Sequence, residues 1–187
     1  MRIFKSFPGK GVCAGALLLA VGGLAVSNAA NEKSSGVLAF DQLKTLVGEW
    51  EGKNQSGPVK VTYTLVSGGT ALMERMQPAN EAEMITMYSA DGDRILVTHY
   101  CSAGNQPSMK TEALKGVGSR YSFSLASVSG LKTPDEGHMV GLILTLVDKD
   151  HLTQSWKYQN NKGRTSEELL EFRRKPEKVA TVVPSGN

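Results

Sequence analysis

The sequence predicts an all-β protein: an antiparallel up-and-down barrel of about ten strands, preceded by one short N-terminal helix. Three features predict this fold. From Gly48 to Arg174, apolar and polar residues alternate, as they do in strands with one buried face. Turn signals rich in Gly, Asn and Asp recur about every ten residues. Strands do not alternate with helices, and consecutive hairpins favour a barrel over a sandwich because closure removes the open edges.

The N-terminal residues have the pattern of a secretory signal peptide. The positively charged n-region contains Arg2, Lys5 and Lys10 and precedes the apolar run Gly11–Val26. Ser27-Asn28-Ala29 then offers the small residues at which a signal peptidase cuts. The apolar run is shorter than the roughly 20 residues of a membrane-spanning helix. We therefore expect residues 1–29 to be removed and the protein to be secreted or periplasmic.

Removal of the signal peptide would also remove the net charge. The whole chain has 21 basic and 18 acidic residues; the first 29 residues hold three basic and no acidic ones, which leaves 18 of each. A neutral mature chain gives no support to the binding of nucleic acid or of an anionic membrane. Cys101 would be the only remaining cysteine, which excludes an intramolecular disulfide, so the domain must be stabilised by its core.

The rest of the chain divides into a linker, one domain and a tail. Residues 30–37 are small and polar and are expected to form a linker, followed by the barrel domain over residues 38–175. Apolar residues at helical spacing predict a short helix over Val37–Val47, packed against one end of the barrel. Residues 176–187 are polar with two prolines and are expected to be disordered.

The strands are placed by their alternation and by the turns between them. Asp91-Gly92-Asp93 and Asn160–Gly163 are typical hairpin turns, because glycine accepts the positive φ that such turns need. Ser102–Ser108 is expected to be a polar loop, and Val128–Gly137 is the longest irregular stretch. After a first strand that begins at Gly48, the expected strands are Val59–Leu65, Thr70–Gln77, Glu83–Ser89, Arg94–Cys101, Met109–Gly116, Ser119–Ser127, His138–Val147, His151–Gln159 and Arg164–Arg174.

The order of these elements resembles the calycin superfamily, which includes lipocalins, fatty-acid-binding proteins and nitrobindin-like barrels. The resemblance rests on Gly48-Glu49-Trp50 after a short helix, on the run of antiparallel strands, and on a basic residue in the last strand, Arg173 or Arg174. It implies that Trp50 plugs one end of the barrel and that the arginine packs on it. A cation–π contact of this kind contributes about 0.5–2 kcal/mol.

More narrowly, the chain is similar to an uncharacterised family of secreted bacterial lipocalin-like domains. The similarity is carried by the segment from Met87 through Asp91-Gly92-Asp93 to Thr98–Cys101 and Asn105-Gln106-Pro107. It extends over roughly residues 40–174. This resemblance implies an exported barrel that holds a small ligand.

The residues most suited to contact a ligand cluster around the end of one strand and its loop. Alternation places His99 and Cys101 on the same strand face as Ile95 and Val97, so they line the interior if Val97 points inward. Trp156 and Tyr158 share a face on a later strand, and flexible thioethers suit an adaptable apolar pocket. The candidate ligand-binding residues are His99, Cys101, Asn105, Gln106, Met109, Trp156 and Tyr158.

Several interpretations of this set remain open. The favoured one is a barrel that binds a small apolar or amphipathic molecule. The alternatives are an enzyme on the same barrel with His99 as acid or base, and an interaction module with a packed interior. Nitrobindin-like barrels bind haem through a late-strand histidine, but His138 and His151 lie beside turns, so haem is less favoured. We expect no cofactor, because no metal-ligand spacing occurs.

Overall fold

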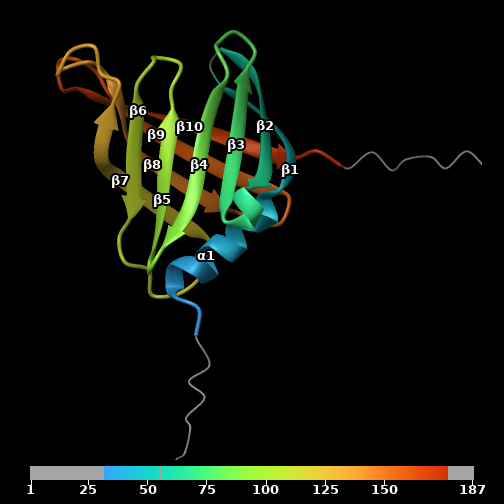
Figure 1. Ribbon diagram of the computed structural model, residues 1–187. Helices are drawn as coiled ribbons and strands as arrows, with labels where there is room; N and C mark the ends of the chain where they lie inside the picture. Colours follow the sequence, from blue (N-terminus) through green and yellow to red (C-terminus); the bar gives the residue numbers. More distant parts are fainter. Residues whose placement is uncertain (1–31, 55, 177–187) are drawn as a thin grey trace, which may run out of the picture. The chain divides into compact units, whose positions relative to one another are not determined.

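The computed structural model describes residues 32–54 and 56–176, which fold into one closed antiparallel barrel (Figure 1). The predicted fold class is confirmed. Every strand pairs with its sequence neighbours, and β1 pairs with β10 to close the ring. The helical elements are α1 (Ser35–Leu43), η1 (Lys44–Leu46) and η2 (Ser67–Gly69). The strands are β1 (Gly48–Asn54), β2 (Gly57–Val66), β3 (Ala71–Pro78), β4 (Met84–Asp91), β5 (Arg94–Tyr100), β6 (Gln106–Thr111), β7 (Arg120–Ser129), β8 (His138–Leu146), β9 (His151–Gln159) and β10 (Thr165–Arg174).

Several boundaries differ from the expected ones, such as the end of β6 at Thr111 rather than Gly116, and two of the differences have a local reason. The helix begins at Ser35, inside the predicted linker, because the Ser34 side chain accepts a hydrogen bond from the Val37 amide and caps it. Strand β6 begins at Gln106 rather than Met109, because the alternation of buried residues already starts in the predicted loop. The predicted signal peptide, the first two linker residues and the tail beyond Pro176 lie outside the described residues. No described helix has the length and apolarity to cross a membrane.

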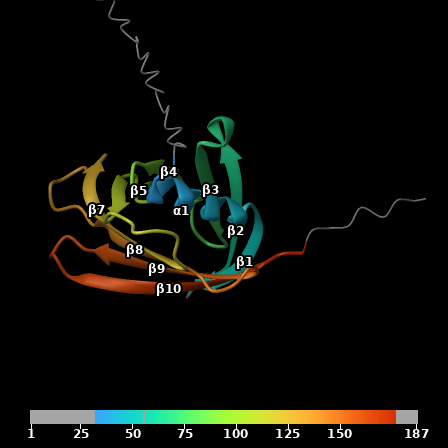
Figure 2. The same cartoon turned by 90° about the horizontal axis from the view of Figure 1, so that it is seen from below.

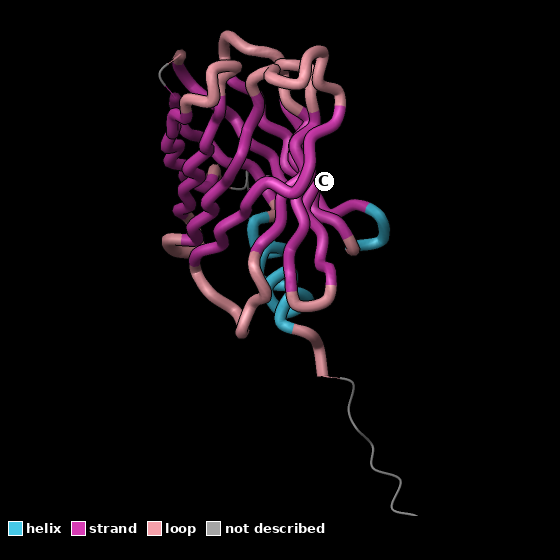
Figure 3. Tube along the Cα trace, turned by 90° about the vertical axis from the view of Figure 1, so that its left-hand side faces the viewer, coloured by secondary structure: helices cyan, strands magenta, loops and turns pink. Residues whose placement is uncertain are grey.

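The helical segment covers one end of the barrel (Figures 2 and 3). Ala39, Phe40, Leu43 and Leu46 are buried on its inner side. Gly36 packs directly on the β4–β5 hairpin, where a Cβ atom would lie 2.4 Å from the Arg94 carbonyl oxygen. A side chain at this position would therefore push the helix off the barrel.

Trp50 and Arg174 are in contact at the seam of the barrel, where the first strand, β1, pairs with the last strand, β10. Their Cα positions are partners in the β1–β10 ladder, and the guanidinium carbon of Arg174 lies 4.2 Å from the centre of the Trp50 ring. The Trp50 indole donates to the Leu46 carbonyl at 2.8 Å. Arg174 donates to the carbonyls of Thr45, Val47 and Lys149 at 2.7, 2.9 and 3.0 Å. One pair thus joins β1, β10 and the end of the helical segment.

Arg173, the other basic residue considered for this role, is exposed on the outer face of β10. The two arginines differ because successive strand residues point to opposite faces. Arg174 continues the inward phase of Leu170 and Phe172, and Arg173 continues the outward phase of Glu171.

This difference predicts the effects of two neighbouring substitutions. Arg174→Ala removes the cation–π contact and three charged hydrogen bonds, so we expect it to lower the free energy of unfolding by about 2–4 kcal/mol in urea titrations. Arg173→Ala is the matched control and should change it by less than about 0.5 kcal/mol. Equal effects of the two substitutions would contradict the conclusion that Arg174, and not Arg173, stabilises the seam.

Candidate functional site

A row of polar side chains runs along the inner face of four adjacent strands, β2 to β5. Tyr63, Glu74, Thr86 and His99 are consecutive cross-strand partners on β2, β3, β4 and β5, and all four are buried. Directly paired residues on one face lie about 4.5–5.5 Å apart, so neighbouring side chains of the row can interact. The strands therefore assemble a continuous polar strip in an otherwise apolar core.

Gln154 and Trp156 on β9 meet this row from another part of the wall. The Gln154 side-chain nitrogen donates to the Tyr63 hydroxyl at 2.8 Å and to Glu74 Oε2 at 2.9 Å. The Trp156 indole donates to Gln154 Oε1 at 2.8 Å, and its ring centre lies 4.6 Å from that of His99. We refer to Tyr63, Glu74, Thr86, Tyr88, His99, Gln154 and Trp156 as the interior cluster.

Glu74 is the acidic residue at the centre of the interior cluster. It is completely buried, and its Oε2 also accepts a hydrogen bond of 2.6 Å from the Tyr88 hydroxyl. Burial raises the pKa of Glu74, while the hydrogen bonds from Tyr88, Gln154 and Tyr63 act in the opposite direction. Burial and the nearby Glu74 charge raise the pKa values of both Tyr63 and Tyr88, so these phenols stay protonated and act as donors.

His99 lies at the other end of the row as a neutral imidazole. Its Nδ1 shares a 2.9 Å hydrogen bond with the Thr86 hydroxyl, and burial lowers its pKa from 6.5 to about 4. A neutral imidazole has one donor and one acceptor nitrogen, so the atom opposite Thr86 can accept or donate one further hydrogen bond. Its contact with Trp156 fixes the ring plane beside the indole.

Three buried polar atoms have no hydrogen-bond partner among the described residues: Glu74 Oε1, His99 Nε2 and Asn105 Oδ1. In folded proteins most buried polar atoms are paired with protein or with water, so each exception needs an explanation. All three belong to inward-facing or fully buried residues. Two members of the interior cluster, Glu74 and His99, and the neighbouring Asn105 therefore each have one atom that could bind a further polar group.

The His99 end of the cluster lies away from the helical segment. Helix α1 packs at Gly92 and Arg94, where β5 begins, whereas His99 is next to the last residue of β5. Beyond it, the Asn105 amide donates to the Gly137 carbonyl at 3.0 Å, and Gly137 lies directly against the Tyr158 hydroxyl. The loops before β6 and β8 thus surround this end, which we refer to as the far end.

The candidate residues from the sequence fall into two groups. His99, Asn105, Met109 and Trp156 are buried in the interior, with Met109 at 1% exposure. Cys101 is partly buried and packs against the core beyond His99.

Gln106 and Tyr158 are outside the interior. The Gln106 amide donates to the Gly104 carbonyl and accepts from Ser129, so it stabilises the loop instead. Tyr158 is 36% exposed at the rim of the far end. Whether any of these residues contacts a ligand stays a prediction.

Five of the seven members of the interior cluster were not among the candidates: Tyr63, Glu74, Thr86, Tyr88 and Gln154. Glu74 lies on β3 between Leu72 and Met76. The alternation of apolar residues along this strand predicts that all three side chains point into the core. An acidic residue at an inward position is rare unless it is hydrogen-bonded, and this was the available signal. Thr86 and Tyr88 carried no such signal, because both are ordinary strand residues.

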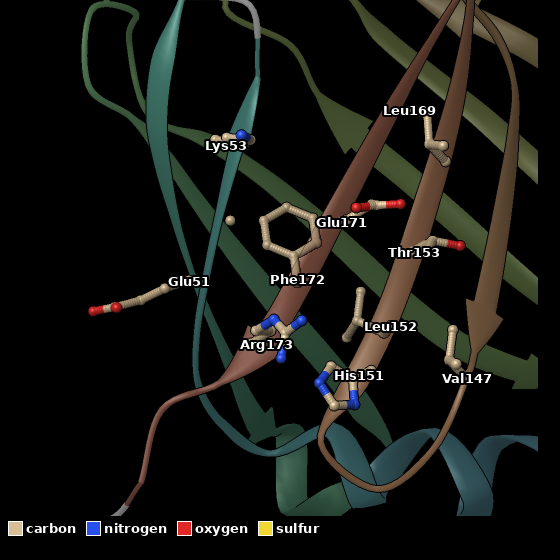
Figure 4. Close-up of a pocket in the computed structure, with 11 residues that line it drawn as sticks. Glu51, Lys53, Val147, His151, Leu152, Thr153, Leu169, Glu171, Phe172 and Arg173 are labelled. Atoms are coloured by element: carbon tan, nitrogen blue, oxygen red, sulfur yellow. The ribbon is translucent and has the colours of Figure 1, made fainter.

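A separate groove of about 600 Å³ lies on the wall formed by β1, β9 and β10 (Figure 4). It contains two exposed apolar side chains, Val147 and Leu169, between charged residues such as Lys53 and Arg173. None of the candidate ligand-binding residues lines it. The groove and the interior cluster are therefore distinct regions of the barrel.

The two late histidines do not join the interior cluster. His138 Nδ1 is hydrogen-bonded to the Glu136 carbonyl, and His151 pairs with Asp148 at 2.7 Å on the surface. Within residues 32–54 and 56–176, no three His, Cys, Asp or Glu side chains come together as a metal site.

Comparison with known proteins supports the barrel fold. No protein-family model and no curated protein matches the chain. The crystal structure of Rv2717c from M. tuberculosis superposes with a TM-score of 0.55 at 14% identity, over 74% of this chain and 98% of that one. A DUF3598 protein of unknown function from Nostoc punctiforme gives a TM-score of 0.48 at 17% identity, over 72% of this chain and 49% of that one.

The neutral state of His99 predicts a pH dependence of stability. The unfolded chain binds a proton at His99 below its ordinary pKa of 6.5, but the folded chain does so only near 4, so stability is lost as the pH falls through this range. We expect this group to account for a loss of up to about 3 kcal/mol between pH 7 and pH 4. The measurement is urea unfolding at both pH values.

His99→Gln isolates this contribution, because it removes the titrating group and keeps a polar side chain. The variant should lose less stability than the wild type over the same pH range. An NMR titration of the His99 imidazole with a midpoint near 6.5 in the folded protein would contradict this account.

Proposed function

We propose that this chain is an exported lipocalin-like protein of the calycin type that binds one small, mostly apolar molecule inside the barrel. The observation that carries the proposal is the set of unpartnered buried atoms at Glu74, His99 and Asn105. A barrel that only needed a packed core would be better stabilised by apolar residues at these positions, because unpaired buried polar atoms cost free energy.

The walls around these atoms favour a small and mainly apolar ligand. Met109, Phe123 and Leu142 are buried in the interior, and the partly buried Met139 packs against the same core. Met84 lies one inward position beyond Thr86 and pairs with Met76 on β3. Unbranched thioether side chains rearrange easily, so Met76, Met84 and Met139 provide an adaptable lining near the far end.

The proposed export rests on the N-terminal pattern rather than on the fold. Arg2, Lys5 and Lys10 with the following apolar run supply the features of a signal peptide. A barrel with a single free cysteine at Cys101 is compatible with an oxidising compartment, because no second cysteine of the domain can pair with it.

A fluorescent probe tests the proposed binding. N-phenyl-1-naphthylamine is apolar, carries one N–H group, and brightens when it leaves water. We expect saturable binding to the wild-type protein and a loss of about tenfold in affinity in His99→Leu, because one buried hydrogen bond to the probe is removed.

Leu169→Ser is the control for the outer groove, and it should leave the affinity unchanged while circular dichroism confirms the fold of both variants. The opposite pattern, with weaker binding only in Leu169→Ser, would place the probe outside the barrel. Absence of saturable binding to the wild-type protein, together with no co-purified molecule, would overturn the proposed function.

A further inference from the structure

The interior cluster contains a buried acidic group, Glu74, that has no cationic partner among the described residues. Glu74 is completely buried, and its interactions are with Tyr63, Tyr88 and Gln154, none of which carries a positive charge. The ion pairs of the described residues are formed by other acidic side chains, such as Glu83 with Arg75. A buried carboxylate without a cation is costly unless something else compensates it.

The hydrogen bonds of the cluster converge on one oxygen of Glu74. The Trp156 indole is only a donor, so the Gln154 atom that meets it must be the oxygen. The Gln154 nitrogen then turns toward Tyr63 and Glu74 and donates to Glu74 Oε2. Together with the Tyr88 hydroxyl, two donors converge on this oxygen. The Tyr88–Glu74 distance of 2.6 Å is typical of a hydrogen bond to an ionised acceptor.

The other oxygen of the same carboxylate is the open position. Glu74 Oε1 is buried and has no partner among the described residues. A proton placed there would find no acceptor, whereas a positively charged donor would complete the hydrogen bonding and balance the charge.

A second acidic residue lies beside the cluster, on β10. Glu168 on β10 pairs with Trp156 on β9 and continues the inward phase of the buried Leu170. Burial and the charge of Glu81 raise the pKa of Glu168, and this side chain takes part in none of the ion pairs of the described residues. Two acidic groups in succession create a negative potential that attracts cations toward the interior.

Given the proposed binding function, on which this inference rests, we propose that the barrel selects small organic ammonium ions with an apolar body. The ammonium group donates to Glu74 Oε1, and the apolar body lies among the methionine and aromatic side chains. The neutral His99 Nε2 accepts a second hydrogen bond from a primary ammonium group or from a hydroxyl on the same molecule. Anionic molecules of similar size are rejected by Glu74 and Glu168.

Three probes of nearly equal shape test this selectivity. Isothermal titration calorimetry at pH 7 compares 2-phenylethylammonium, 2-phenylethanol and phenylacetate with the wild-type protein. We expect the cation to bind at least about tenfold more tightly than the alcohol, and the anion to bind more weakly than either. A wild-type protein that binds the alcohol as well as the cation would overturn the inference and leave the proposed function intact.

Two variants identify the groups responsible. Glu74→Gln keeps the shape but removes the charge, and it should reduce the preference for the cation to below about threefold while 2-phenylethanol still binds. Glu168→Gln changes a less buried position, so this variant should keep its fold even if Glu74→Gln fails to fold. It should lower the affinity for the cation alone by about two- to threefold. An unchanged preference in both variants would overturn the inference, whereas binding of none of the three probes would count against the proposed function itself.

Discussion

The contact between Trp50 and Arg174 is the interaction on which the closed barrel depends. A sheet becomes a barrel only when its first and last strands pair, and here the two residues are partners in that pairing. Arg174 also bonds the carbonyls at the end of η1, while Trp50 bonds that of Leu46. The helical segment is consequently attached at the seam, where its last carbonyl groups would otherwise lack partners.

The two ends of the barrel differ in hydrogen bonding: the polar side chains named at the helix end are hydrogen-bonded, whereas two buried side chains away from it have an atom without a partner. At the helix end, Trp50 and Arg174 use their donors on backbone carbonyls, and Tyr121 donates to Gln42 of α1. Away from it, Glu74 and His99 retain unpartnered atoms although both are buried. Stability accounts for the first arrangement but not for the second, and this contrast supports a binding role for the interior.

The sequence predicted the barrel well because its signals are local. Alternation and turn residues identify each strand, and the Gly48-Glu49-Trp50 segment marks the first one. The site was predicted only in part, because it is assembled across strands. His99 and Trp156 were found as unusual residues, whereas the role of Glu74 follows from its register with Tyr63 and Thr86. The choice between Arg173 and Arg174 likewise needed the phase of β10.

Native mass spectrometry of the protein, purified without denaturation, tests the central claim that the interior holds a ligand. The account predicts one small molecule bound per chain, displaced when 2-phenylethylammonium is added and bound less tightly by Glu74→Gln than by the wild type. A ligand-free chain that remains unaltered by any of the three phenyl probes would contradict it, and Glu74 and His99 would then be members of a purely structural network.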